Sequence, residues 1–238
     1  MTSVAIIDYG SGNLRSVAKA FERVAGDASG IEVTSSPDVV ASASHIVLPG
    51  VGAFADCMRG LKALPGMLES LQEQVLQRKK PFLGICVGMQ MLFEKGHEHG
   101  VHAGLGWLEG EVVGLSSLRG TVGDEAIQKQ QAGSPRLQVQ ARDDDKLKIP
   151  HMGWNNLIVH GTHSLLKGIE TGAHAYFVHS YHAVCKNASD VLATVEYGQT
   201  IAAVVGRGNI LGTQFHPEKS QETGLRLLGI FAFILMRM

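Results

Sequence analysis

Cysteine is scarce in this 238-residue sequence: only Cys57, Cys86 and Cys185 are present, widely spaced and without a C-x-x-C pair. An odd number of scattered cysteines argues against a disulfide framework and against a zinc site built from cysteine pairs. The pattern is typical of a protein from a reducing compartment, so we expect a cytoplasmic location.

An excess of charge of either sign is also missing. Lys and Arg number 21 and Asp and Glu 22, for a net charge of −1. This balance offers no basic field for nucleic acid and no polybasic patch for a membrane surface, so we expect neither partner. Long hydrophobic runs are absent too, because residues 4–7 are cut off by Asp8 and residues 227–236 are too few to span a bilayer. We predict no signal peptide and no membrane-spanning segment.

Apolar runs and helical patterns alternate through the first half of the chain, as in βα units whose parallel sheet is covered on both faces. Strands are expected at 4–7, 31–35, 45–48 and 81–85, and helical stretches from about 14, from about 53, at 61–80 and at 89–93. The second half is predicted to add strands at 109–113, 175–179, 191–197, 201–206 and 210–214, then a helix from about 221.

The last three of these strands are expected to be antiparallel because only brief turns separate them. The predicted fold class is therefore α/β: a mostly parallel central sheet with helices on both faces, plus antiparallel C-terminal strands. In such a sheet the functional site lies at the carboxyl ends of the strands.

The length and a hydrophobic fraction of 45% suit a single domain over residues 1–238. One segment differs in composition. Residues 118–148 are rich in Gly, Gln and charge, including Asp143-Asp144-Asp145, and hold too few apolar residues to offset the entropy of ordering them. We predict a mobile insertion at about 118–148.

The chain is organised around Gly84-Ile85-Cys86-Val87-Gly88, which follows an apolar run and precedes a helical one. This G-x-C-x-G pattern is typical of a nucleophile elbow, where glycines are needed because strand and helix backbones pass closely. A thiol at a helix N-terminus is favoured as the thiolate, which is the attacking form. A lone cysteine among apolar residues is more often buried and inert, so Cys86 needs partners to count as a nucleophile.

The partners are predicted in His216-Pro217-Glu218, at the end of the last expected strand. Proline pushes the preceding residue into extended conformation, so the side chains of His216 and Glu218 should lie on one side. A carboxylate on one ring nitrogen leaves the other free to take a thiol proton. Cys86, His216 and Glu218 thus form a candidate catalytic triad.

Acyl transfer also needs donors for the negative charge that develops on a carbonyl oxygen. The Val87 N–H is one candidate, directly after the nucleophile. The second is placed at Val51 in the turn Gly50-Val51-Gly52, whose glycines permit a peptide to flip; the alternative is a tight turn and nothing more. The loop Gly10-Ser11-Gly12 is not interpreted as a nucleotide site, because Arg15 stands where the third glycine of that motif would be.

These motifs, together with stretches 8–16, 49–52 and 150–155, make the sequence resemble the class I (triad) glutamine amidotransferases. Within that family it is similar to the glutaminase subunits of imidazole glycerol phosphate synthase. The elbow and His-Pro-Glu carry the first resemblance, and Asp8-Tyr9-Gly10-Ser11-Gly12-Asn13-Leu14 and Pro150-His151-Met152-Gly153-Trp154-Asn155 carry the second. The family pattern has a short connection where residues 118–148 stand here.

The resemblance implies hydrolysis of L-glutamine through a γ-glutamyl thioester on Cys86. Ammonia would pass through a channel to a (βα)8-barrel cyclase, which forms imidazole glycerol phosphate and AICAR from PRFAR in histidine biosynthesis. The two chains would form a heterodimer without cofactor or metal. His97, His99 and His102 are accordingly interpreted as a solvated loop rather than as metal ligands.

The resemblance also implies further site residues. Glu98 is the candidate for the glutamine α-ammonium group, with Glu94 as the alternative. Trp154 is expected at the partner interface, although such a residue is more often core, and the Val51 N–H is expected to be misdirected in the resting subunit. The other implied residues are Gly50, Gly52, Gln90, Ser180 and Tyr181 for the substrate, and Asn13 and Met152 for the partner.

Three alternatives remain open at this stage. In these alternatives to the interpretation above, the chain would be a glutaminase subunit of another amidotransferase, a stand-alone cysteine hydrolase on the same fold, or a catalytically dead scaffold. The complete triad argues against the scaffold. Stimulation of glutamine turnover by the cyclase and its ligand would argue against a stand-alone hydrolase.

Overall fold

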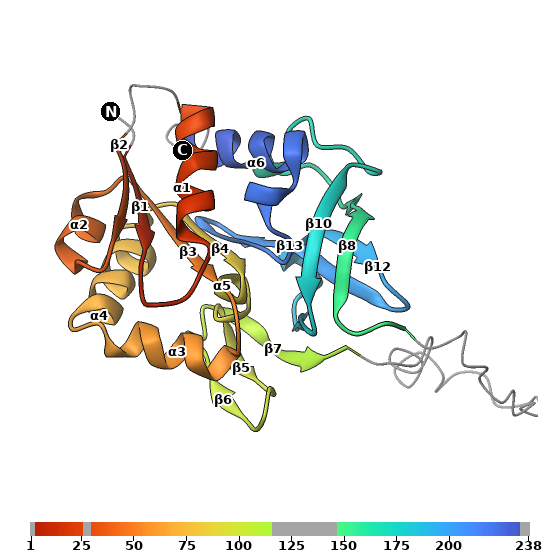
Figure 1. The fold of residues 1–238 in the computed structure, drawn as a ribbon, viewed down its shortest axis with the longest axis horizontal. Coiled ribbons are helices and arrows are strands. Elements are labelled where there is room, and N and C mark those ends of the chain that lie inside the picture. The colour runs from red at the N-terminus through yellow and green to blue at the C-terminus, as the bar shows by residue number, and fades with distance from the viewer. Residues whose placement is uncertain (1–2, 26–29, 116–146, 234–238) are drawn as a thin grey trace, which may run out of the picture.

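The structure, a computed structural model, describes residues 3–25, 30–115 and 147–233. Its centre is a sheet of eight strands (Figure 1). In spatial order these are β2 (Gly30–Thr34), β1 (Ser3–Ile7), β3 (His45–Gly50), β4 (Phe82–Cys86), β14 (Ile210–Thr213), β13 (Thr200–Arg207), β12 (Val191–Glu196) and β9 (Ile158–Val159). The first five run parallel. Strands β12, β13 and β14 pair antiparallel with one another, as predicted from the sequence, although β14 also pairs parallel with β4. Strand β9 adds to β12 in antiparallel orientation.

Strands β3 and β4 are buried at every position, and β1 at four of its five. Such uninterrupted burial requires cover on both faces of the sheet. Helices α1 (Leu14–Ala25) and α6 (Gln221–Phe233) pack against each other. Right-handed crossovers place α2 (Pro37–Ser42), α3 (Phe54–Ala63) and α4 (Met67–Leu71) on the face opposite α1. None of the helices in the described part of the chain has both the length and the apolar character to cross a membrane.

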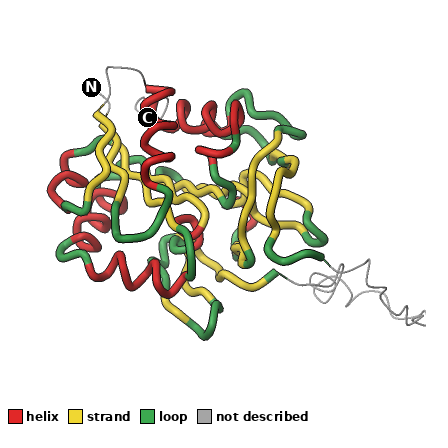
Figure 2. Tube along the Cα trace, viewed as in Figure 1, coloured by secondary structure: helices red, strands yellow, loops and turns green. Residues whose placement is uncertain are grey.

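Two smaller sheets complete the fold (Figure 2). One is a two-stranded antiparallel ribbon of β8 (His151–Asn156) and β10 (His174–His179). The other contains, in spatial order, β11 (Tyr181–Cys185), β7 (Leu108–Gly114), β5 (Phe93–Gly96) and β6 (His102–Ala103). Short 3-10 turns lie at Ser164–Leu166, Ala188–Asp190 and Pro217–Lys219.

Two helix predictions were wrong in extent. The helix after the elbow, α5, covers only Val87–Gln90, and Phe93 begins β5 because its strand pairs with β7 at Leu108. A short apolar run cannot be assigned to helix or strand by periodicity alone. The helix expected over 61–80 is divided at Gly66, whose φ of 73° breaks it, and ends in a π-helical segment, Gln72–Gln77.

The register of the sheet brings the expected site together at one edge. Gly50, the last residue of β3, lies opposite Cys86, the last residue of β4. On the other side of β4, Thr213 pairs with Ile85, so the chain leaving β14 passes beside Cys86. The candidate residues therefore meet at the carboxyl ends of parallel strands, which is where such a sheet is expected to hold its functional site. Residues 118–146 of the predicted insertion lie outside the described residues.

Candidate active site

Cys86 occupies a sharp turn between β4 and α5. Its φ of 55° and ψ of −112° are unusual for a residue with a side chain, and such backbone strain persists only where the surroundings hold it. The flanking glycines allow this turn: a Cβ on Gly84 would lie 2.5 Å from the Gly88 carbonyl oxygen, and a Cβ on Gly88 would overlap the carbonyl oxygen of Leu48. The steric reason for the G-x-C-x-G pattern is therefore present in the structure.

His216 and Glu218 form a buried pair beside this turn. The His216 Nδ1–H donates to Glu218 Oε1 over 2.9 Å, and the two side chains are 3% and 1% exposed. His216 is extended, with φ −94° and ψ 100°, as expected before proline. Glu218, however, lies in the 3-10 turn Pro217–Lys219, so the pair forms across the start of a turn rather than by alternation along a strand.

The protonation of His216 suits it to act on a thiol. Burial alone would lower the pKa of the ring, but the neighbouring Cys86 and Glu218 outweigh burial and raise that pKa to about 10. The ring is then an imidazolium at neutral pH, so it holds a proton that it can donate. Within the described residues, His216 Nε2 is buried and bonded to no other group, which leaves it to exchange a proton with sulfur.

A cavity of about 230 Å³ opens over the Cys86 thiol and the His216 ring. Its wall includes all the predicted substrate and oxyanion residues except Gly50: Val51, Gly52, Val87, Gln90, Glu98, Ser180 and Tyr181. Gly50 lies behind the wall, where a Cβ would approach Gly88 N and the Tyr9 hydroxyl to 2.7 Å. Gly50 therefore affects the shape of the cavity indirectly, because a side chain there would push against the residues behind the wall.

The two candidate carboxylates for an ammonium group are separated by the structure. Glu98 lines the cavity, and its Oε2 accepts a hydrogen bond from the Phe54 N–H at the start of α3, 2.7 Å away. Glu94 is exposed, outside the cavity wall, and accepts from the Gly110 N–H. The geometry favours Glu98 as the carboxylate that a substrate in this cavity would meet.

One residue near the thiol, Gln214, was not predicted from the sequence as part of the site. Gln214 is fully buried, and its Nε2–H donates to Cys86 Sγ at 3.8 Å. Its Oε1 accepts from Gln90 Nε2 at 3.1 Å, and the same Gln90 nitrogen donates to the Tyr181 carbonyl oxygen at 2.8 Å. The signal available was position: Gln214 directly follows the strand that delivers His216, and a polar residue there must find a buried partner.

The Val51 peptide is held away from the role predicted for it. Its N–H donates to Ser11 Oγ over 3.3 Å, while its carbonyl oxygen accepts from the Ser11 hydroxyl and from the Cys57 thiol. An N–H engaged by Ser11 is not available to an oxyanion on the thiol side. The Val87 N–H belongs to the first residue of α5, where backbone N–H groups have no partner within the helix.

We predict that Ser11→Ala releases the Val51 peptide and increases hydrolysis of glutamine, the substrate that the family resemblance implies, about 30-fold in the isolated chain. The reason is that rotation of this peptide would no longer break two hydrogen bonds to Ser11, each worth about 1 kcal/mol net. Glutamate formation by the chain alone measures this, with Ser16→Ala, a half-buried serine on α1, as control. An unchanged basal rate in Ser11→Ala would contradict the prediction.

The predicted partner residues differ in exposure. Met152 and Trp154 on β8 are 62% and 48% exposed, which is unusual for large apolar side chains, and Trp154 meets the Tyr176 ring edge-on. Asn13 is partly buried at the start of α1, where its carbonyl oxygen accepts from the Val17 N–H. The exposure places Trp154 at the surface of this chain rather than in its core.

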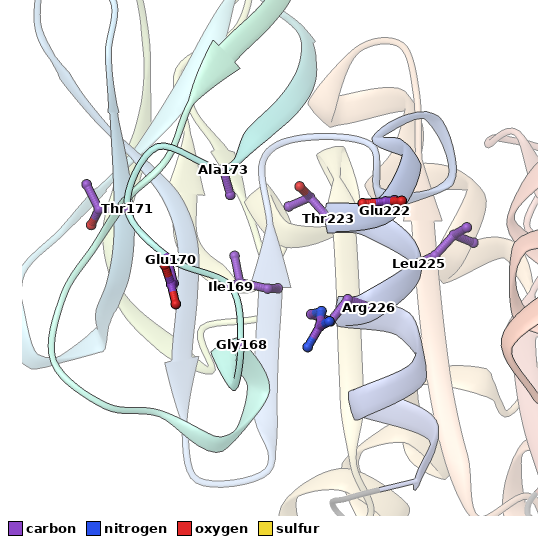
Figure 3. A pocket seen from close by; sticks show the side chains of 9 residues that line it. All are labelled: Gly168, Ile169, Glu170, Thr171, Ala173, Glu222, Thr223, Leu225 and Arg226. Carbon is purple, nitrogen blue, oxygen red and sulfur yellow. The ribbon is translucent and has the colours of Figure 1, made fainter.

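The hollow with the largest volume among those described lacks the chemistry of the Cys86 cavity. It has a volume of about 640 Å³ and lies between segment 168–173 and α6 (Figure 3). Its charged side chains are Glu170, Glu222 and Arg226, and its lining includes no cysteine or histidine. His97, considered above as a metal ligand, bonds Glu111 at 2.8 Å, and across the described ranges no three His, Cys, Asp or Glu side chains gather as a metal site requires. The absence of a metal stays a prediction.

Comparisons with known proteins agree with the geometry. The family model described as glutamine amidotransferase class-I matches residues 5–233. The chain is 51% identical to "Imidazole glycerol phosphate synthase subunit HisH" of Agrobacterium fabrum, over 96% of this chain and 97% of the relative. It is equally identical, with the same coverage, to the protein of that name from Rhodospirillum rubrum.

Solved structures share the fold at low identity. One described as a glutamine amidotransferase has a TM-score of 0.65 and 16% identity, covering 96% of this chain and 98% of that one. Another, of PurLQS from Thermotoga maritima, has a TM-score of 0.63 and 17% identity over 98% and 99%. At these identities the likeness establishes the fold alone.

Proposed function

Since this chain belongs to the class I glutamine amidotransferase family, we propose that it is the glutaminase subunit of an imidazole glycerol phosphate synthase. It hydrolyses L-glutamine and delivers ammonia to a cyclase subunit in histidine biosynthesis. The observation that carries the proposal is that a strained Cys86 and His216 line one cavity, and that His216 is hydrogen-bonded to the buried Glu218. Relatives named HisH, half identical over nearly the full length, support the specific subunit.

We propose that the reaction proceeds in two halves. The Cys86 thiolate attacks the γ-carboxamide carbon of glutamine, and the negative charge on oxygen is bound by the Val87 N–H and, after its peptide rotates, by the Val51 N–H. The C–N bond breaks as the His216 imidazolium gives its Nε2 proton to the leaving nitrogen, which departs as ammonia. Cys86 is left as a γ-glutamyl thioester.

Hydrolysis of the thioester restores the enzyme. His216, now neutral, takes a proton from water, and the hydroxide attacks the thioester carbonyl. The C–S bond breaks, glutamate leaves, and Cys86 and His216 regain their starting charges. Glu218 keeps its hydrogen bond to Nδ1 throughout, which orients the ring and stabilises its positive form. Glu98 binds the substrate α-ammonium group at the cavity wall.

The proposed partner is a (βα)8-barrel cyclase that forms imidazole glycerol phosphate and AICAR from PRFAR. The proposal includes a heterodimer in the cytoplasm, an ammonia channel across the interface, no cofactor, and no contact with nucleic acid or membrane. Met152 and Trp154 support the interface because large apolar side chains exposed together mark protein contacts. Asn13, at the carboxyl edge of the sheet, is proposed to contact the same partner.

We predict that Trp154→Ala weakens the complex with the cyclase at least 30-fold, as expected for an aromatic residue that contributes about 2 kcal/mol to an interface. The melting temperature of the isolated chain should change little, because the side chain is 48% exposed there. Titration calorimetry and thermal unfolding measure the two effects. Val33→Ala, an exposed residue on β2, is the control, and a large drop in melting temperature for Trp154→Ala would return that residue to the core.

The function is tested by mixing this chain with a barrel cyclase and following glutamate formation with and without the cyclase's nucleotide substrate. Glutamine turnover should rise when cyclase and nucleotide are both present, because the Val51 N–H is engaged by Ser11 in the chain alone. Turnover that is the same with and without the partner would favour the stand-alone hydrolase. Stimulation by the partner of anthranilate or GMP synthesis instead would favour another amidotransferase.

A further inference from the structure

Two buried histidines outside the triad form a hydrogen-bonded pair between β8 and the cavity. His151 lies on β8 and is 2% exposed, and His179 lies on β10 and is 6% exposed. His151 Nδ1 is 3.0 Å from His179 Nε2, and His179 Nδ1 is 2.9 Å from the carbonyl oxygen of Tyr181. The mechanism above uses neither ring, although His179 forms part of the cavity wall.

The hydrogen-bond partners of the two rings determine which ring nitrogens carry a hydrogen. A carbonyl oxygen only accepts, so His179 Nδ1 carries a hydrogen and donates to Tyr181. Burial lowers the pKa of His179 to about 3 and that of His151 to about 4, so both rings are neutral at physiological pH. His179 Nε2 is then an acceptor, and the donor to it is the Nδ1–H of His151.

The outer end of the pair is fixed by a residue beside the exposed tryptophan. Asn155 Nδ2 donates to His151 Nε2 over 3.3 Å and to the Glu196 carbonyl oxygen over 3.0 Å. The His151 ring is stacked between the Phe177 and Tyr197 rings, with centroids 4.7 Å and 3.9 Å away. The pair is thus held both by aromatic packing and by directed hydrogen bonds.

The inner end meets a residue of the substrate site. The Tyr181 carbonyl oxygen that accepts from His179 also accepts from Gln90 Nε2 over 2.8 Å. The second proton on Gln90 Nε2 goes to Gln214 Oε1, and Gln214 donates in turn to Cys86 Sγ. With both amide protons engaged, Gln90 can present only its Oε1 to a ligand, which makes it a hydrogen-bond acceptor of fixed orientation.

We propose that His151 and His179 are positioning residues for glutamine: they hold the Tyr181 carbonyl where it orients the Gln90 amide as an acceptor for an N–H group of the substrate. The series of hydrogen bonds described above begins on β8, next to Met152 and Trp154, and ends at Cys86 Sγ. The proposal rests on the proposed function in taking glutamine as the ligand. Removal of the His151 donor leaves His179 Nε2 buried and unpaired, so the Tyr181 carbonyl and Gln90 lose their fixed geometry.

The direct test is His151→Phe in the complex with the cyclase, because phenylalanine keeps the stacking between Phe177 and Tyr197 but cannot donate. We expect KM for glutamine to rise about tenfold with kcat changed less than about threefold, and ammonium-dependent synthesis to be unaffected. His174→Phe, at an exposed histidine on β10, is the matched control. An unchanged KM in a folded His151→Phe complex overturns the proposal.

A double-mutant cycle separates positioning from a general structural role. If His151 acts through Gln90, then His151→Phe should weaken glutamine binding about tenfold in a Cys86→Ala background but less than about twofold when Gln90→Leu is also present. Calorimetry of glutamine binding to the complex measures all four variants without turnover. Equal losses with and without Gln90→Leu overturn the proposal, whereas absence of glutamine hydrolysis in the wild-type complex would instead refute the proposed function.

Rescue by a second variant covers the case in which His151→Phe does not fold. His151→Asn retains a donor that overlays the Nδ1–H and removes the aromatic ring. The proposal expects His151→Asn to keep KM for glutamine within about threefold of wild type even if its melting temperature falls. A tenfold higher KM in a folded His151→Asn complex would overturn it.

Discussion

Cys86→Ala is expected to abolish glutamine-dependent synthesis by the complex, with a loss on the order of 10⁴-fold or more, as when the nucleophile of a catalytic triad is removed. Synthesis from added ammonium salt should continue near the wild-type rate. The reason is that no thioester forms without the sulfur, whereas ammonia supplied from solution needs none of the chemistry of this cavity. Product formation with each nitrogen source, measured side by side, tests the prediction.

The control for this experiment is Cys185→Ala. Cys185 is a half-buried cysteine on β11, outside the wall of the Cys86 cavity, so its removal should leave both nitrogen sources usable. Loss of both activities in Cys86→Ala would show a role beyond ammonia supply. Retention of glutamine-dependent synthesis would remove Cys86 from the mechanism altogether.

Acidification from pH 7 to 5 is expected to lower the free energy of unfolding by several kcal/mol. Burial lowers the pKa of His45 and His151 to about 4 and of His179 to about 3, from an ordinary value of 6.5. Below pH 6.5 the unfolded chain therefore binds protons that the folded chain does not, and stability falls as pH falls. For His45 alone the loss by pH 5 is roughly 2 kcal/mol.

His216 contributes with the opposite sign. Its pKa is raised to about 10, so the stability it provides is fully present below pH 6.5 and is lost as pH rises through 10. Between pH 7 and 5 the stability gained from His216 is small compared with the stability lost through His45, His151 and His179, whose rings are neutral in the folded chain. Urea unfolding at a series of pH values gives the net slope, and a stability that is flat or rising on acidification would contradict the prediction.

His45→Gln should make this pH dependence shallower by roughly 2 kcal/mol at pH 5, because one neutral buried imidazole is gone. The ring lies against Phe231, with centroids 5.3 Å apart, and bonds Ser44 Oγ, so the variant is compared by slope rather than by absolute stability. His174→Asn, at an exposed histidine, is the control and should keep the wild-type slope. Equal slopes for all three proteins would show that His45 is not the titrating group.

The sequence predicts the parallel half of the fold because the pattern that specifies each βα unit lies within one short stretch of residues. An apolar run of four or five residues and a following helical pattern specify β1, β3 and β4 without reference to the rest of the chain. The family match confirms the resemblance on which the function was expected. The G-x-C-x-G pattern was informative for the same local reason: its glycines answer a steric requirement within five residues.

The remaining features depend on residues far apart in sequence. Strand β5 forms because Phe93 pairs with Leu108, and its apolar start resembles the end of a helix. The Ser11–Val51 contact joins residues 40 positions apart, and Gln90 meets Gln214 across 124. No local pattern encodes such pairs, so the engaged Val51 N–H and the role of Gln214 required the three-dimensional structure.

The pairing of β14 with β4 has a consequence for synthesis of the protein. Translation produces the thiol of Cys86 long before it produces His216, and the strand that carries the imidazole enters the middle of the sheet rather than its edge. A growing polypeptide on the ribosome thus holds a nucleophile without its base and a sheet that is not yet closed. The triad is complete only when this last strand of the central sheet has joined its neighbours.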